Sequence, residues 1–182
     1  MIIFPIFAQE FFFMNFNKIL LDFIQQVRVH PNVTAFKIND ALVTNAQFAQ
    51  KIAPIMNELD TLNSDNVAIL MENDVQTYAA MVACMLSNKK LILVNSQWSE
   101  SQKSQVLSLY NVSEVLTANR MNYYYWMTVE DAIDRIDSGL IQVADEQIVA
   151  TVHDFSSDGQ LKTKEIRASE INSLNVVKHP FL

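Results

Sequence analysis

Glycine is the residue that this sequence most clearly lacks. Only Gly139 and Gly159 occur among 182 residues, whereas an average content of about 7% predicts roughly thirteen. The glycine-rich patterns Gly-x4-Gly-Lys-Ser/Thr and Gly-x-Gly-x-x-Gly, which cradle phosphates, do not occur in the sequence. The scarcity of glycine therefore excludes the common glycine-rich nucleotide sites.

Cysteine is also scarce. Cys84 is the single cysteine, so the chain cannot form an intramolecular disulfide, which suits a reducing environment, and we expect a cytoplasmic protein. Cys84 lies in an apolar helical stretch and is expected to be a small buried hydrophobe, with a reactive thiol as the alternative. No Gly-x-Ser-x-Gly elbow is present, so the sequence predicts no catalytic nucleophile.

Basic residues are fewer than acidic residues in this sequence. Thirteen Lys and Arg stand against 20 Asp and Glu, for a net charge of −7. This balance argues against nucleic acid or an anionic membrane surface as a partner, because both require clustered cations. His30, His153 and His179 are far apart, and no pair has the i, i+4 spacing of a zinc site, so we expect no bound metal.

The N-terminal residues are apolar but fit no membrane span. They contain no run of 18 apolar residues, and no Lys or Arg precedes Lys18, as a secretory signal would require. Because Met14 starts a stretch that reads as a natural chain start, we interpret residues 1–13 as an over-extended start or a disordered segment, with a signal-like segment as the alternative. Residues 14–182 are then expected to form a single α/β domain.

Helical signals recur along the chain. From Phe16, apolar residues return every three or four positions as far as Val27, and Pro31 ends this helix. Further helices are predicted to follow the capping signals Thr44 with Gln47, Asp74, and Ser99 with Gln102. A short acidic helix is predicted over 128–136.

Short apolar runs separate these helices. They predict strands over 33–38, 67–71, 91–94 and 112–117, with a possible strand at 123–127. Nearly continuous apolar strands that alternate with helices are typical of a parallel sheet covered by helices. The sequence therefore predicts an α/β layered fold.

The last third of the chain changes character and predicts a β-hairpin, with strands over 147–155 and 161–166. Ser156 and Ser157 in the turn, with Lys162 and Lys164 on the outgoing strand, could hold phosphate oxygens through hydroxyl, backbone N–H and ammonium groups. An ordinary exposed hairpin tip explains the same residues, because Ser-Asp-Gly is common in turns and lysines protect strand edges. On the local pattern alone, the ordinary tip is favoured.

Four stretches taken together resemble a known family. They are His30–Phe36 (HPNVTAF), Val43–Phe48 (VTNAQF), Val67–Asn73 with Tyr78–Ala83 (VAILMEN, YAAMVA), and Ile92–Asn95 (ILVN). In this order they are similar to the N-terminal part of the adenylate-forming superfamily, which includes acyl- and aryl-CoA synthetases and the adenylation domains of peptide synthetases. The resemblance covers about residues 14–174 and implies the layered parallel-sheet subdomain of that family.

Residues 156–165 occupy the place of the family's phosphate loop, usually Thr-Ser-Gly-(Ser/Thr)-Thr-Gly-x-Pro-Lys-Gly. Ser156 and Ser157 match its hydroxyl pair, Lys164 matches its lysine, and Lys162 matches a frequent lysine at the x position. The resemblance therefore implies that these four residues are what survives of a contact with nucleotide phosphates. It assigns no catalytic residue in this chain.

The same loop departs from the family at four positions. Asp158, Leu161 and Glu165 stand where the family has glycine, and Thr163 stands where it has proline. The two carboxylates place negative charge against a triphosphate, and Leu161 adds a side chain where the backbone must approach closely. These residues argue against binding of Mg-ATP, the cofactor that the resemblance implies.

Intact members of the family activate a carboxylic acid with Mg-ATP, release pyrophosphate and pass the acyl group to the thiol of coenzyme A or a carrier protein. Their acyl, adenine and catalytic-lysine sites come later than the position of Leu182. We therefore expect a divergent, truncated relative of these ligases that does not catalyse adenylation alone. One alternative is a non-catalytic α/β module or pseudoenzyme that pairs with itself or a fuller ligase. Another is an unrelated flavodoxin-like domain, whose hairpin would not lie beside the ends of the parallel strands.

Overall fold

The computed structural model describes residues 16–112, 115–121, 127–139, 144 and 146–173. The expectations for residues 1–13 and most of the possible strand at 123–127 lie outside this part. Within it, the strands form a two-stranded sheet, β1–β2, and a five-stranded sheet of order β5-β3-β4-β6-β7. The predicted α/β layered fold is confirmed.

The N-terminal third joins a helix, a small hairpin and a long helix. Helix α1 (Phe16–Val29) is followed by β1 (Thr34–Ile38), β2 (Ala41–Thr44) and α2 (Asn45–Asp60). The predicted capping box at the start of α2 is present, because the Thr44 hydroxyl accepts a hydrogen bond from Gln47 N and the Gln47 side chain accepts one from Thr44 N. Pro54 lies inside α2.

The main sheet begins with three parallel strands. β3 (Asn66–Met71) pairs with β4 (Lys90–Asn95) on one side and β5 (Val115–Leu116) on the other. Helix α3 (Val75–Leu86) connects β3 to β4 and α4 (Glu100–Leu109) connects β4 to β5, whereas α5 (Ala118–Met121) and α6 (Val129–Ser138) follow β5. The predicted strand over 112–117 is present as β5, in which Val115 and Leu116 pair with β3, and residues 113 and 114 lie outside the described part.

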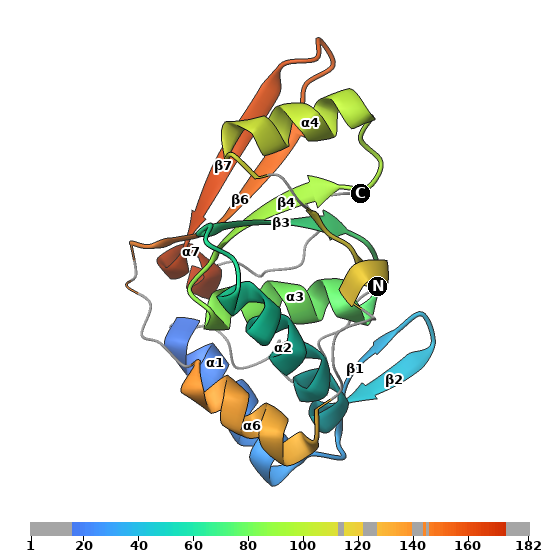
Figure 1. Ribbon diagram of the computed structural model, residues 1–182, viewed down its shortest axis with the longest axis vertical. Coiled ribbons are helices and arrows are strands. Elements are labelled where there is room, and N and C mark those ends of the chain that lie inside the picture. Colours follow the sequence, from blue (N-terminus) through green and yellow to red (C-terminus); the bar gives the residue numbers. More distant parts are fainter. Residues whose placement is uncertain (1–15, 113–114, 122–126, 140–143, 145, 174–182) are drawn as a thin grey trace.

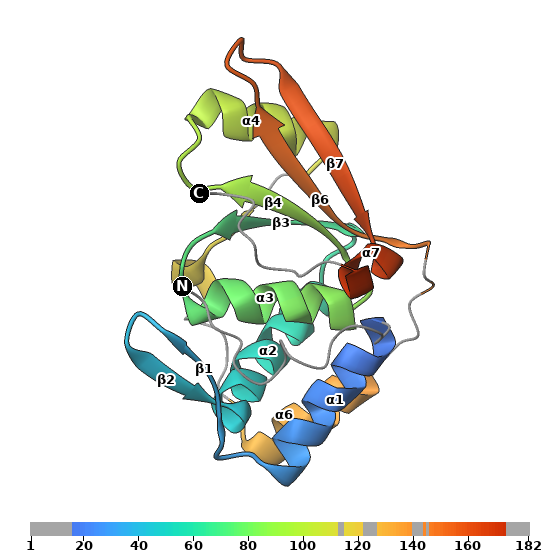
Figure 2. The ribbon, with the colours of Figure 1, turned by 180° about the vertical axis from the view of Figure 1, so that it is seen from behind.

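The helices cover the two faces of the sheet unequally. Helix α3 lies against one face, with α2 behind it and α1 and α6 outermost, whereas α4 lies on the opposite face (Figures 1 and 2). The larger hydrophobic cluster fills the side of α2 and α3, and its fully buried residues include Ile52, Met56 and Ile69. A smaller cluster around Val94 and Val106 fills the side of α4.

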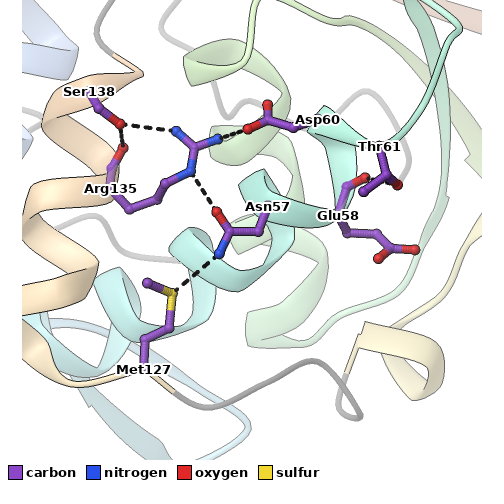
Figure 3. A network of polar contacts seen from close by, with 7 residues as sticks. All are labelled: Asn57, Glu58, Asp60, Thr61, Met127, Arg135 and Ser138. Carbon is purple, nitrogen blue, oxygen red and sulfur yellow. Dashed lines mark hydrogen bonds and ion pairs between the residues drawn. The ribbon is translucent and has the colours of Figure 1, made fainter.

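Helix α6 is fastened to α2 by a polar network centred on Arg135 (Figure 3). The Arg135 guanidinium donates to Asn57 Oδ1 at 2.7 Å and to Asp60 Oδ2 at 2.5 Å, and it also contacts the hydroxyl of Ser138. The residue after Ser138 is Gly139, and a side chain at this position would have little room, because its Cβ would lie 2.2 Å from the Met56 methyl carbon. This network therefore has a structural role, which is to hold the outer layer onto the inner one.

The chain then forms a long hairpin, β6 (Ile148–Phe155) and β7 (Leu161–Arg167), before the short helix α7 (Ala168–Ser173). β6 runs parallel to β4 with Leu91 beside Ala150 and Ile92 beside Thr151, so its last residues reach the carboxyl end of β4 and beyond. The hairpin rises away from the rest of the sheet as a protruding arm (Figure 1). The turn between β6 and β7 therefore lies on the carboxyl-end side of the parallel strands.

Candidate functional site

The turn at the tip of the β6–β7 arm is a tight one. Gly159 N donates to the Ser156 carbonyl at 2.8 Å, and Ser156 N donates to the Gln160 carbonyl at 2.9 Å. Gly159 has a φ of +81°, which glycine adopts at little cost. These features define a three-residue hairpin loop that ends in a left-handed glycine. The local sequence Ser-Asp-Gly favours this turn, as expected for an ordinary hairpin tip.

Inside this turn, the side chain of Asp158 accepts two hydrogen bonds. Its Oδ1 accepts a hydrogen bond from the Ser156 hydroxyl and another from Gln160 N at 3.3 Å. The hydrogen bond from Ser156, followed by that from Gln160, lowers the pKa of the Asp158 carboxyl below its ordinary value. The turn therefore already contains an anion, supplied by its own sequence.

Three of the four predicted phosphate-binding residues share one face of the arm. Side chains alternate along a strand, so Ser156 lies on the same face as Lys162 and Lys164. Asp154 lies on this face as well, directly across from Lys162 in the antiparallel register. Ser157 is exposed at the tip. Asp154 is not among the site residues predicted from the sequence, although the hairpin register places it opposite Lys162.

Leu161 and Glu165 point to the other face of the arm. Leu161 packs on the smaller hydrophobic cluster with Trp98 and Phe155, whose rings meet edge to face at 5.2 Å. Glu165 Oε1 lies 3.3 Å from Lys90 Nζ. The carboxylate of Glu165 thus faces away from Lys162 and Lys164, and the expectation that it sits against a phosphate bound there needs correction.

A buried polar cluster lies on this second face, where β6 meets α4. His153 is 2% exposed, and its Nε2 lies 3.0 Å from the hydroxyl of Tyr110, the residue that caps α4. Burial lowers the pKa of His153, and Lys90 acts in the same direction. The alternation of β6 predicted opposite directions for His153 and Asp154, but nothing local in the sequence predicts the contact with Tyr110.

Two further features bear on the site. Among the described ranges, no three His, Cys, Asp or Glu side chains gather into a group that could hold a metal ion. None of the helices in those ranges is long and apolar enough to cross a membrane. The chemistry of the arm is therefore that of hydroxyl, ammonium and carboxylate groups.

Comparison with known proteins gives matches in structure alone. No family model matches the chain, and no curated protein matches it. Among solved structures, it is similar to the Klebsiella oxytoca NpsA N-terminal subdomain in complex with 3-hydroxyanthranilyl-AMSN, with a TM-score of 0.61 and 17% identity over 87% of this chain and 42% of that one. It is also similar to the Vibrio cholerae adenylation domain AlmE in complex with glycyl-adenosine-5'-phosphate, with a TM-score of 0.67 and 12% identity over 88% of this chain and 37% of that one. VinN in complex with 3-methylaspartate matches with a TM-score of 0.60 and 12% identity, over 87% and 49% of the two chains.

These matches establish the fold. The chain has the fold of the N-terminal subdomain of adenylation enzymes, as its resemblance to the adenylate-forming superfamily implied. It spans less than half the length of the NpsA, AlmE and VinN chains that it matches. The flavodoxin-like alternative required a hairpin away from the ends of the parallel strands, whereas the register of β6 with β4 carries the turn to their carboxyl-end side.

Proposed function

We propose that this chain is a divergent adenylation-type domain that does not bind Mg-ATP through its phosphate-loop position and does not catalyse adenylation alone. One observation carries the proposal: the carboxylate of Asp158 accepts hydrogen bonds from the Ser156 hydroxyl and the Gln160 amide. Phosphate oxygens would need these same donors. In this chain, a carboxylate of the loop itself takes them.

Electrostatics supports the same conclusion. A phosphate that entered the turn would approach the Asp158 carboxylate, and like charges repel at short range. The hydrogen bonds of Asp158 also favour its ionised form, because they lower its pKa. The negative charge therefore persists at neutral pH, and a triphosphate would have to displace it.

The relation to an intact ligase is part of the proposal. NpsA, AlmE and VinN are roughly two to three times as long as the part that this chain matches, since the match covers 42%, 37% and 49% of those chains. In a complete adenylation enzyme, the substrates would be Mg-ATP and a carboxylic acid, and the acyl group would pass to coenzyme A or a carrier protein. We propose that this chain supplies the scaffold of such an enzyme without its nucleotide chemistry, either beside a fuller ligase or as a pseudoenzyme.

A second candidate function, retained contact with phosphates, is favoured by one observation. Ser156, Lys162 and Lys164 share one exposed face of the arm, and two ammonium groups with a hydroxyl suit a phosphate. Asp154 opposes this reading, because its carboxylate lies on the same face across from Lys162. The two candidates differ in whether Mg-ATP binds the unaltered chain.

Calorimetric titration with Mg-ATP separates them. The unaltered chain should give no binding heat at millimolar Mg-ATP, whereas the variant Asp158→Gly, which removes the carboxylate from the turn, should bind. The matched control is Asp40→Gly, which removes one carboxylate from an exposed turn elsewhere and should leave binding absent. Saturable binding by the unaltered chain, lost in Lys162→Ala/Lys164→Ala, would support the second candidate and overturn the first.

A further inference from the structure

The outer edge of the main sheet is strand β7. Among the described strands, β7 is hydrogen-bonded to β6 alone. The hydrogen bond from Ser156 N to the Gln160 carbonyl makes these two residues a hydrogen-bonded pair. Along two antiparallel strands, hydrogen-bonded pairs alternate with pairs that are not hydrogen-bonded. The backbone groups of Lys162 and Lys164 therefore face β6, and those of Leu161, Thr163 and Glu165 face outward.

The side chains beside this edge are positively charged on one face. Lys162 and Lys164 are both exposed and lie two residues apart on the same face of β7. Within the part of the chain that the structure describes, no ion pair involves either ammonium group. Asp154 lies on the same face across from Lys162 but forms no ion pair with it among the described residues, so the two exposed ammonium groups remain available to an acidic partner.

A second copy of this chain is a poor occupant of the edge. Two β7 strands related by a two-fold axis would pair antiparallel, and each possible register places residues of the same side of the sheet opposite one another. Centred on Thr163, such a pair would set Lys162 against Lys164 of the copy, and centred on Lys164 or Glu165 it would set like charges directly opposite. Like charges in directly opposed positions destabilise a strand pair. The lysines thus disfavour self-pairing in the registers centred on residues 162 to 164.

We propose that β7 is a docking edge for an extended, acidic segment of a partner protein, which adds a strand beside Leu161, Thr163 and Glu165. The outward backbone groups of these three residues would form the ladder. Carboxylates two residues apart in the partner strand would lie beside Lys162 and Lys164. The same two lysines that disfavour a second copy therefore select an acidic strand. This inference does not depend on the Asp158 turn, although it uses Lys162 and Lys164, the two lysines of the second candidate function.

The proposal is tested with a labelled seven-residue peptide of alternating valine and glutamate, matched in length to β7, and its valine–lysine counterpart. Fluorescence anisotropy with the full chain should show saturable binding of the acidic peptide, with an affinity about fivefold or more above that of the basic one. The variant Lys162→Glu/Lys164→Glu should invert this preference. Lys18→Glu/Lys37→Glu makes the same change in net charge on exposed side chains elsewhere and should leave the preference unchanged.

A backbone variant tests the ladder separately. Thr163→Pro removes an outward-facing N–H and leaves the ladder to β6 intact, since proline is tolerated at strand edges; it should lower the affinity for the acidic peptide at least about fivefold. Circular dichroism checks that the variant is folded. If it is not folded, the charge-reversal variant Lys162→Glu/Lys164→Glu still tests the proposal. No saturable binding at millimolar peptide, equal binding of both peptides, or a preference that survives charge reversal would each overturn the proposal.

Discussion

The hydroxyl oxygen of Tyr110 lies 3.0 Å from Nε2 of His153, and the two rings meet edge to face with centroids 5.4 Å apart. This contact joins the end of α4 to strand β6 across the smaller hydrophobic cluster. Lys90 Nζ lies 5.4 Å from the centre of the Tyr110 ring and 3.3 Å from Glu165 Oε1. The base of the arm is therefore held by a polar cluster that contains a buried, titratable histidine.

The first prediction concerns pH. Burial lowers the pKa of His153 in the folded chain. Below the ordinary histidine pKa of about 6.5, the unfolded chain therefore binds more protons than the folded chain does. Above about pH 6.5, protonation of His153 should therefore not reduce stability. As the pH falls below about 6.5, the free energy of unfolding should decrease, by at most about 1.4 kcal/mol per pH unit from this one group. Urea unfolding at pH 7.5 and 5.0 measures the effect.

The variant His153→Gln isolates this contribution, because glutamine does not titrate and can still bond to Tyr110. It should lose less stability between the two pH values than the unaltered chain does. His30→Gln, the same substitution at an exposed position, provides the control for the chemical change itself. Identical pH dependence in the unaltered chain and His153→Gln would contradict this account of the cluster.

A second prediction concerns the attachment of α6. Arg135 is 17% exposed in its side chain and bridges α6 to Asn57 and Asp60 of α2 (Figure 3). The variant Arg135→Met should lower the free energy of unfolding by about 1–2 kcal/mol, because it removes charge-assisted hydrogen bonds that are only partly screened. Lys37→Met removes an exposed ion pair with Asp40 and should change stability by less than about 0.5 kcal/mol. Equal effects of the two variants in urea unfolding would show that the Arg135 network contributes little.

The third prediction concerns Cys84. Its side chain is fully buried, and burial raises the pKa of the thiol to about 12. Since the thiolate is the reactive form, labelling by a thiol reagent at pH 8 should be at least about a hundredfold slower in the native chain than in urea. Rapid labelling of the native chain would restore the alternative that Cys84 is a reactive thiol.

Local signals in the sequence account for most of the fold. The helix starts at Thr44 and Ser99 were predictable because each capping box involves residues only three apart. The pairing of Val115 and Leu116 with β3 was not, because it joins residues distant in sequence. The direction of the Glu165 side chain and the contact between Tyr110 and His153 were also missed, since both depend on residues distant in sequence.

The candidate site shows the same division. The turn at 156–160 and its glycine could be predicted from Ser-Asp-Gly chemistry, and so could the shared face of Lys162 and Lys164. The position of the Asp158 carboxylate inside the turn could not be predicted, because it depends on a side-chain rotation that only the folded turn selects. That detail decides between a phosphate site and a closed turn.

The most direct test of the central claim follows the backbone amide of Gln160 by nuclear magnetic resonance during a titration with Mg-ATP. In the unaltered chain Asp158 holds this amide, so its signal should not move at millimolar Mg-ATP. In Asp158→Ala the donors of Ser156 and Gln160 are released, and the signal should shift in a saturable way. A saturable shift in the unaltered chain, matched by Asp158→Ala, would contradict the claim that Asp158 closes the loop to phosphate.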